Sequence, residues 1–235
     1  MQNTKQHIVV FSGAGLSAES GILTFRDSDG LWENYRIEEV ATPEAWQRNP
    51  ELVQQFYNSR RKQIISAQPN LAHLKIAELE NVYQVSVITQ NIDDLHERAG
   101  STNVIHLHGN IRLAKSSGPQ PDKKYYPIEG WQLTEKDVCD EGYLLRPHVV
   151  WFGETVPMYE VAMEIIQQAN VLLVIGTSLN VYPAAGLIHY AKKATQKMLI
   201  DPKANTFNLP QEFELINASA EVGIQRFINK ITRLT

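Results

Sequence analysis

Short runs of apolar, often β-branched residues alternate along this chain with segments of helical periodicity. The runs lie at 7–12, 85–89, 104–107, 171–175, 197–200 and 213–216. Their near-continuous apolarity favours strands buried on both faces of a parallel sheet. Helices are predicted at 43–66, opening at Thr42-Pro43, at 70–80 with Asn70 as N-cap, at 158–169, at 183–194 and at 219–233 with Ser219 as N-cap. This alternation predicts an α/β fold with a Rossmann-like, doubly wound parallel sheet.

Residues 112–145 do not fit this alternation. They include the polar stretch KSSGPQPDKK and scattered aromatic residues, without a clear period. We assign them to a smaller lobe inserted in the main fold, and the long helix at 43–66 is a second candidate for that lobe. A chain of 235 residues is within reach of one domain. We therefore expect one catalytic domain over 1–235, with a small lobe at approximately 32–70 and 111–146.

The charge balance and the cysteine content exclude several classes of protein. The formal net charge is −4, and no long run of Lys and Arg is present, so we do not expect nucleic acid as a partner. The apolar stretch near the start is too short for a signal peptide or a membrane span, which predicts a cytoplasmic protein without a membrane partner. The single cysteine, Cys139, excludes an intrachain disulfide and a four-thiolate metal site.

A glycine turn follows the first strand run and precedes a predicted helix start. In Gly13-Ala14-Gly15-Leu16-Ser17 the missing side chains let the backbone approach a pyrophosphate, whose charge a helix N-terminus favours. The alternative is that these glycines serve only a tight connection. The chain continues with a polar loop over 20–27 instead of a second strand ending in a ribose-binding acid, which argues against a hydride-transfer dehydrogenase. We expect this loop to cover the cofactor.

Five motifs together resemble the sirtuin (Sir2) family. They are GAGLSAESGILTFRDSDGLW (13–32), TQNIDDLHERAG (89–100), LHGN (107–110), RPHVVWFGE (146–154) and GTSLNVYPAA (176–185). Their order and spacing match the family over roughly residues 7–200, with most likeness to its desuccinylase and demalonylase class. The resemblance implies an NAD-dependent protein lysine deacylase that acts on acyl-lysine proteins or peptides and releases nicotinamide and O-acyl-ADP-ribose.

The resemblance also implies a set of cofactor-binding residues. They lie in the glycine turn, in the loop that covers the cofactor, after the strand run at 85–89 and after the run at 171–175. These residues are Gly13, Ala14, Gly15, Ser17, Phe25, Arg26, Gln90, Asn91, Ile92, Asp93, Gly176, Thr177 and Ser178. Two alternatives stay open. Asn91 and Asp93 are also placed to cap a helix that begins near 93, and Phe25 fits ordinary packing.

The family resemblance makes His108 the general base, with Asn91 as a second catalytic residue. A neutral imidazole near its reference pKa accepts a proton from a ribose hydroxyl at physiological pH. A histidine in an isolated LHG triplet would more often be structural. His106, two residues earlier, points the same way along an extended strand and competes for the same role.

Two segments resemble the family's binding site for the substrate peptide. Within 148–154, Val149 and Phe152 would line the lysine tunnel, with Gly153 and Glu154 beside them. On the peptide's other side the resemblance places Asn180, Val181 and Tyr182. The first segment resembles an edge to which a peptide adds as a strand. The alternative is a buried strand without a binding role.

Tyr57 and Arg60 stand at i and i+3 of the predicted helix at 43–66, and therefore on one face. Sirtuins that remove succinyl and malonyl groups carry this Tyr-x-x-Arg pair. A guanidinium and a phenol suit a terminal carboxylate. In the alternative, Tyr57 packs in the core and Arg60 forms a solvated face together with Arg61 and Lys62.

Two departures from the family pattern affect the cofactors. Where most sirtuins carry two zinc-binding Cys pairs, this chain reads RLAKSS (112–117) and VCDE (138–141), so no zinc is expected, and Tyr125, Tyr126, Ile128, Trp131 and Leu133 are expected to pack a metal-free lobe. Asp201 replaces the usual Asn near the adenosine ribose. Its carboxylate can accept hydrogen bonds from the ribose hydroxyls, and its negative charge would repel NADP⁺. The alternative is that Asp201 begins the turn at Pro202.

A sirtuin-like fold also serves ADP-ribosyltransferases, NAD⁺ hydrolases and non-catalytic NAD⁺ sensors. Asn91, Asp93 and His108 are all present, which argues against the sensor. The sequence leaves the transferase and the hydrolase as alternatives.

Overall fold

All six predicted strand runs are strands of one sheet. The computed structural model describes residues 5–23 and 35–232. The strands are β1 (His7–Ser12), β2 (Gln84–Thr89), β3 (Val104–His106), β7 (Val171–Ile175), β8 (Gln196–Asp201) and β9 (Phe213–Asn217). They lie in the order β3-β2-β1-β7-β8-β9, and every neighbouring pair is parallel. The doubly wound sheet is therefore confirmed, and the strand order reverses between β1 and β7.

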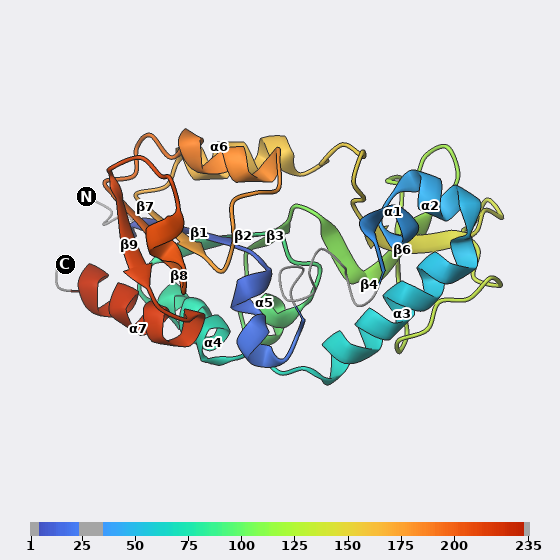
Figure 1. Cartoon of the computed structure of the whole chain (residues 1–235), viewed down its shortest axis with the longest axis horizontal. Helices are drawn as coiled ribbons and strands as arrows, with labels where there is room; N and C mark the ends of the chain where they lie inside the picture. The colour runs from blue at the N-terminus through green and yellow to red at the C-terminus, as the bar shows by residue number, and fades with distance from the viewer. Residues whose placement is uncertain (1–4, 24–34, 233–235) are drawn as a thin grey trace.

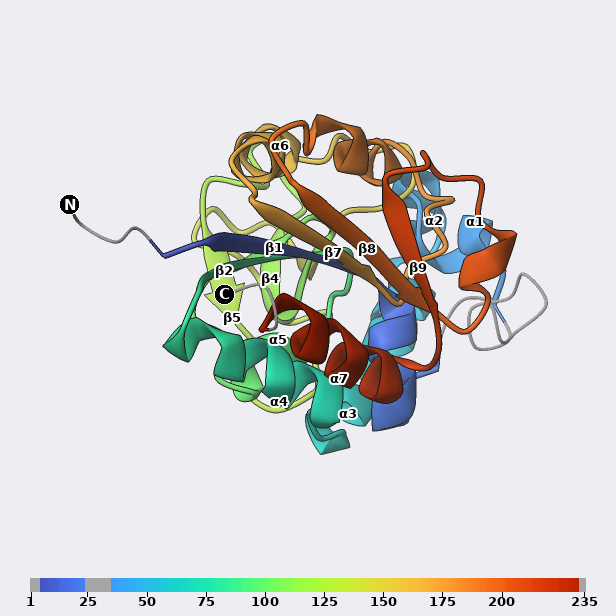
Figure 2. The ribbon, with the colours of Figure 1, turned by 90° about the vertical axis from the view of Figure 1, so that its left-hand side faces the viewer.

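Helical segments cover both faces of this sheet (Figure 2). On one face, Ile8 and Val10 of β1 pack in a cluster with α4 (Leu71–Glu78) and α7 (Ala220–Ile231). On the other face, Val9 and Phe11 join a second cluster. It includes residues of α6 (Tyr159–Gln167) and of the 3₁₀ segment η5 (Ala184–Tyr190). The period-two alternation of β1 thus divides the core into two layers.

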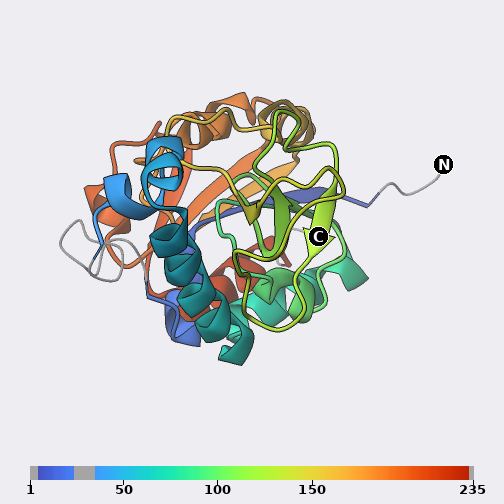
Figure 3. The ribbon, with the colours of Figure 1, turned by 90° about the vertical axis from the view of Figure 1, so that its right-hand side faces the viewer.

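A smaller antiparallel sheet lies at the opposite end of the molecule (Figures 1 and 3). Its strands, in the order β5-β4-β6, are β4 (Gly109–Ser116), β5 (Tyr125–Pro127) and β6 (Leu145–Val149). Helices α1 (Ile37–Val40), α2 (Pro43–Arg48) and α3 (Pro50–Ser66) lie beside it. The expectation of irregular structure over 112–145 therefore missed β4 and β5, whose polar residues hide the alternation. The bounds of the small lobe stay a prediction.

The single helix predicted over 43–66 is wrong, because the chain breaks at Asn49. Its backbone is not helical (φ −152°, ψ 79°), since a following proline disfavours the helical conformation, and Pro50 begins α3. Each half has its own cap: the Thr42 hydroxyl accepts the Ala45 N–H, and the Asn49 side chain accepts the Leu52 N–H.

Other helix predictions are confirmed or corrected at their ends. Asn70 caps α4 as expected, by accepting the N–H groups of Ala72 and His73. Ser219 lies at the N-cap position of α7 but makes no side-chain cap hydrogen bond. The segment predicted as a helix over 183–194 is only the 3₁₀ turn η5, which contains the weak helix former Gly186.

Short helices complete the described chain. The helix start predicted after the glycine turn consists of two 3₁₀ turns, η1 (Ala14–Leu16) and η2 (Ala18–Ser20). The others are η4 (Leu79–Asn81), α5 (Leu95–Arg98) and η6 (Ala204–Thr206). Over 5–23 and 35–232, none of the helices has the length and apolarity that a membrane crossing requires.

Candidate functional site

The carboxyl ends of the parallel strands bring most of the predicted cofactor residues to one edge of the sheet. Gly13 follows β1, Gln90 follows β2 and Gly176 follows β7, so these positions flank the point where the strand order reverses. Open α/β sheets bind ligands in the crevice at such a point. Phe25 and Arg26 lie outside the described residues.

The glycine turn packs directly against the backbone after β7. The Gly15 N–H donates to the Gly176 carbonyl at 2.7 Å, and the Gly13 N–H donates to the Ile175 carbonyl at 3.1 Å. Gly176 has φ +63°, and a Cβ added there would lie 2.1 Å from the backbone nitrogen of Leu16. These glycines therefore make the tight connection that was the alternative to phosphate binding, and their phosphate role stays a prediction.

A buried hydrogen-bond chain joins the turn to the segment after β2. The Asn91 amide donates to the Ser17 hydroxyl at 3.0 Å, and that hydroxyl donates to Asp93 Oδ2 at 2.9 Å. The other oxygen of Asp93 accepts the N–H of Leu95, the first residue of α5, at 3.2 Å, although Asp94 and not Asp93 holds the N-cap position. Burial raises the pKa of the Asp93 carboxyl. Asn91 makes no such cap, because its side chain is directed to Ser17.

A second polar pair crosses the ends of β2 and β7. The Gln90 amide donates to the Thr177 hydroxyl at 2.9 Å, while Ser178 is half-buried beside it. Further along the edge, Asp201 Oδ1 accepts the Lys203 N–H at 2.8 Å across a turn at Pro202. The turn role proposed as the alternative for Asp201 is therefore present, and a contact with ribose stays a prediction.

His108 and His106 both reach this segment, and their hydrogen bonds distinguish them. His106 Nδ1 lies 2.9 Å from the Asn91 carbonyl and its Nε2 lies 2.7 Å from Glu97 Oε1. Burial lowers the pKa of His106, but the hydrogen bond and charge of Glu97 outweigh burial and raise it above 6.5. Both ring nitrogens of His106 are therefore engaged, and it is a poor general base.

The hydrogen bond of His108 leaves one nitrogen able to accept a proton. Its Nδ1 lies 3.0 Å from the Gln90 carbonyl, which only accepts, so Nδ1 carries the hydrogen. In the neutral ring Nε2 is then the basic atom. Burial lowers the pKa of His108 below 6.5, which keeps this ring neutral at pH 7.

Two further histidines are buried in the main fold, His73 on α4 and His96 on α5. His96 Nε2 lies 3.0 Å from the Ser12 hydroxyl, and His73 packs edge-on against it with ring centroids 5.0 Å apart. Burial lowers the pKa of His73 from 6.5 to about 4 and that of His96 well below 6.5. Both rings are therefore neutral in the fold at pH 7.

This pair predicts a loss of stability in mild acid. Above pH 6.5 neither state is charged. As the pH falls from 6.5 towards 4, the unfolded state takes up protons that the folded state does not, so stability falls. For His73 alone the loss amounts to about 3 kcal/mol, at ~1.4 kcal/mol per pKa unit. Urea unfolding at pH 7 and pH 4.5 measures most of this loss. In His73→Gln the decrease should be smaller, and an equal decrease in both proteins would contradict the assignment.

The segment after β6 runs beside His108. The Val150 N–H donates to the His108 carbonyl at 2.9 Å, and the Phe152 N–H donates to the Ala41 carbonyl at 3.0 Å. Val149 is buried, whereas Phe152 is 47% exposed. Among the described residues β6 pairs with β4 alone, so it is an edge strand of the described sheet. Its last residues thus lie between the two sheets, next to the predicted base.

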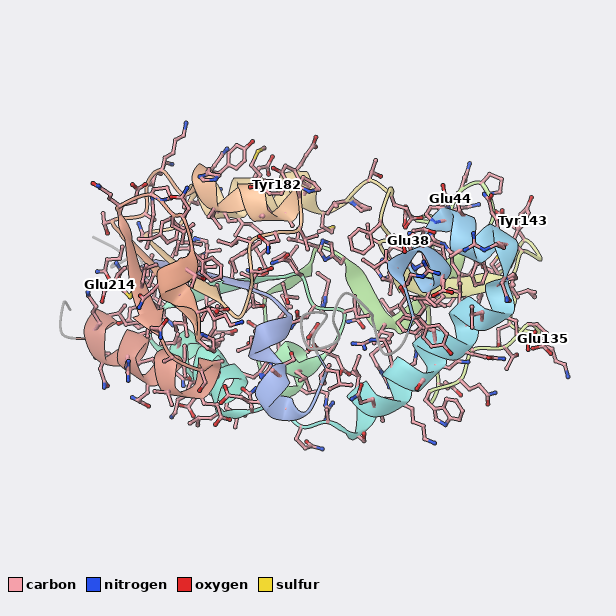
Figure 4. All side chains as sticks on the ribbon, viewed as in Figure 1. Glu38, Glu44, Glu135, Tyr143, Tyr182 and Glu214 are labelled. Carbon is pink, nitrogen blue, oxygen red and sulfur yellow. The ribbon has the colours of Figure 1, made fainter. Side chains whose placement is uncertain are left out.

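The other predicted peptide contacts differ in accessibility. Gly153 is exposed, but both carboxylate oxygens of Glu154 are engaged, with Arg146 at 2.5 Å and with the Trp151 N–H at 2.8 Å. Glu154 therefore supports the segment from within. Across the molecule, Asn180 is exposed, Val181 is half-buried and Tyr182 is 73% exposed. Tyr182 lies on the side formed by α6 and η5 (Figure 4).

Tyr57 and Arg60 are both buried on α3, at 0% and 4% exposure. Arg61 is also buried and donates to the carbonyls of Ile111 and Trp131. The solvated face that was the alternative for these arginines is therefore wrong, and only Lys62 is exposed. Burial raises the pKa of Tyr57, so its phenol is neutral.

Sequence reasoning missed two residues next to Tyr57. Trp151 Nε1 donates to the Tyr57 hydroxyl at 3.1 Å, and the guanidinium of Arg146 lies 3.9 Å from the centre of the indole ring. Both belong to the motif RPHVVWFGE. The sequence signal for these two residues was the short spacing from Arg146 to Glu154, because it places opposite charges on either side of Trp151 in the chain.

The small lobe packs differently from the expectation. Ile128 and Leu133 are buried with Cys139, but Trp131 is 40% exposed and Tyr125 is 38% exposed, stacked on His148. The two loops that would carry zinc ligands are joined instead by a Ser116–Cys139 hydrogen bond and by the ion pairs Lys123–Glu141 and Lys124–Asp140. Over the described part of the chain, no three His, Cys, Asp or Glu residues gather as a metal site.

Comparisons with known proteins agree with this geometry. Residues 13–183 match the Sir2 family. An NAD-dependent protein deacylase of Helicobacter pylori is 48% identical over 231 residues, covering 97% of this chain and 99% of that protein. One of Aggregatibacter actinomycetemcomitans is 54% identical over 198 residues, covering 84% and 94%. The crystal structure of a Sir2 homologue in complex with NAD has a TM-score of 0.84 and 39% identity, covering 98% of this chain and 91% of that one.

Proposed function

This chain belongs to the Sir2 family, and we propose that the site at the carboxyl ends of its parallel strands performs the reaction of an NAD-dependent protein deacylase with His108 as the base. The cofactor is NAD. The residues fit it, because hydrogen-bonding side chains of Ser17, Gln90 and Thr177 gather with the glycine turn at the strand-order reversal, where open α/β sheets bind nucleotides. The substrates are acylated lysines of proteins.

The state of His108 carries the proposal. Bound NAD⁺ supplies a ribose carbon that becomes electrophilic as nicotinamide departs, so that a weak nucleophile such as an amide oxygen can attack it. His108 Nε2 then accepts a proton from a ribose hydroxyl, while its Nδ1–H stays on the Gln90 carbonyl and fixes the ring. The hydrogen bonds from Asn91 to Ser17 and from Ser17 to Asp93 fix these three side chains beside the glycine turn.

One product assay separates deacylation from the alternatives. The protein is incubated with NAD⁺ and acetyl-, malonyl- or succinyl-lysine peptides, and the products are identified and quantified by mass spectrometry. Deacylation gives free lysine, nicotinamide and O-acyl-ADP-ribose in equal amounts. Nicotinamide release without peptide would favour an NAD⁺ hydrolase, ADP-ribose on protein would favour a transferase, and no release would favour a sensor.

We further propose a preference for acidic acyl groups. Tyr57 and Arg60 come from successive turns of α3 and are both buried, and Tyr57 packs in the apolar cluster that also contains Val149 and Ile92. A buried guanidinium and a neutral phenol bind a terminal carboxylate strongly, because charge-assisted hydrogen bonds gain strength away from water. Malonyl- and succinyl-lysine present such a carboxylate, and acetyl-lysine does not.

We also propose that the enzyme works without zinc. Chelation by EDTA should leave the deacylation rate and the melting temperature unchanged, because apolar packing and ion pairs join the loops of the small lobe. The measurement compares dialysed protein with and without EDTA, and with added Zn²⁺. A lower melting temperature after EDTA, restored by Zn²⁺, would contradict it.

Two finer points complete the proposal. Asp201 near the adenosine ribose would favour NAD⁺ over NADP⁺ by charge, which a competition assay with both cofactors tests. A cytoplasmic location agrees with a chain that carries a single cysteine and hence no intrachain disulfide. Cell fractionation tests it.

A further inference from the structure

We propose that Trp151 is a positioning residue that sets the selectivity for acidic acyl groups, by fixing the hydroxyl of Tyr57. The inference rests on the proposed acyl preference and extends it to a residue that contacts no substrate in this scheme. The two side chains are 94 positions apart in sequence and meet through one hydrogen bond, from Trp151 Nε1 to Tyr57 Oη at 3.1 Å.

This hydrogen bond determines where the phenol proton points. An indole N–H only donates, so Tyr57 Oη is the acceptor. The Tyr57 hydroxyl proton must then point away from the indole, towards another acceptor. Tyr57 is fully buried, and burial raises its pKa, so the proton stays on the oxygen. A phenol oriented in this way is a donor to a carboxylate oxygen, whereas the methyl of an acetyl group offers nothing to accept it.

The indole is itself held on several sides. The guanidinium of Arg146 lies over its ring at 3.9 Å, and the ring of Trp46 packs at 5.8 Å. Glu154 accepts the backbone N–H of Trp151 with one oxygen and pairs with Arg146 through the other. Trp151 is 3% exposed. A side chain held this firmly places its N–H within a narrow range, which is what orienting a hydroxyl requires.

The charge around the hydroxyl favours the same ligand. Arg60 and Arg146 both act on the Tyr57 phenol as positive charges, and among the described residues Glu154, which pairs with Arg146, is the acidic group that opposes them there. Nη1 of Arg146 is buried without an acceptor among the described residues. A carboxylate entering this cluster meets more positive than negative charge.

The test replaces Trp151 by Phe, which keeps an aromatic ring and removes the N–H. We expect the ratio of kcat/KM for the succinyl-lysine peptide to kcat/KM for the acetyl-lysine peptide to fall about 3- to 10-fold, which is the effect of one hydrogen bond. The fall should come from a higher KM for the succinyl peptide. Trp46→Phe is the matched control. It alters packing beside Trp151 but removes no donor to Tyr57, so the ratio should stay as in the wild type.

A double-mutant comparison distinguishes positioning from general structural damage. In a Tyr57→Phe background, Trp151→Phe should lower the ratio no further, because the hydroxyl that it orients is already absent. An equal fall in both backgrounds, or a wild-type ratio in Trp151→Phe alone, would overturn the inference while leaving the acyl preference intact. If Tyr57→Phe and Arg60→Met leave the ratio unchanged, the acyl preference itself fails.

Discussion

Replacing His108 by Ala should lower kcat for deacylation by about 10²- to 10⁴-fold, the usual contribution of a positioned general base. Nε2 of His108 is the basic atom of a neutral ring that the Gln90 carbonyl fixes. Among the described residues, His106 is the other histidine at this segment, and both of its ring nitrogens are engaged. The fold should survive, because His108 lies in a turn and is only half-buried. Circular dichroism and NAD⁺ binding by calorimetry check that the variant is folded.

The matched control is His106→Gln, two positions earlier. His106 pairs with Glu97 and the Asn91 carbonyl, so its loss should cost far less activity than the loss of His108. If the two variants lose activity equally, the base is misassigned. The pH profile is a second check: wild-type kcat/KM should fall with acid below pH 6.5, as His108 gains its proton, and stay level above pH 7, because burial lowers its pKa.

The strands and the glycine turn were predictable because local sequence determines them. A buried parallel strand needs apolar residues on both faces, so runs such as VLLVI over 171–175 indicate strands without knowledge of their neighbours. The glycine turn was recognisable for a similar reason. Gly15 and Gly176 come within 2.7 Å of each other through their backbones, and no other residue type permits that approach.

The errors lie where tertiary contacts decide the outcome. Pro50 gave a local signal for the break in the helix over 43–66, but the flanking periodicity is helical on both sides and hides it. Strand β4 carries Arg112 and Lys115, which read as a polar loop until the partner strand β6 is known. The burial of Arg60 and Arg61 was equally hidden, because clustered charges usually face solvent.

The support of Tyr57 by Trp151 was beyond sequence reasoning. The pair joins α3 to the segment after β6, and the hydrogen bond depends on the angle between two elements that no local pattern determines. The motif containing Trp151 nevertheless pointed to the segment that contacts Tyr57. Sequence motifs therefore indicated the candidate site, and the structure supplied the contacts on which the proposed selectivity rests.

Replacing Arg60 by Met should reduce kcat/KM for a succinyl-lysine peptide about 10- to 100-fold relative to an acetyl-lysine peptide. The change keeps the length of the side chain and removes the charge. A carboxylate bound beside Tyr57 therefore loses hydrogen bonds to a charged group, each worth about 1.5–3 kcal/mol.

Arg61→Met is the matched control from the adjacent position. Arg61 is equally buried, but it donates to the Ile111 and Trp131 carbonyls and to Asn58, so its loss should lower the melting temperature and leave the ratio of the two rates unchanged. Kinetics of both peptides on each folded variant measure the effect. Equal ratios for the two arginine variants would mean that Arg60 supports the fold and does not bind the acyl group.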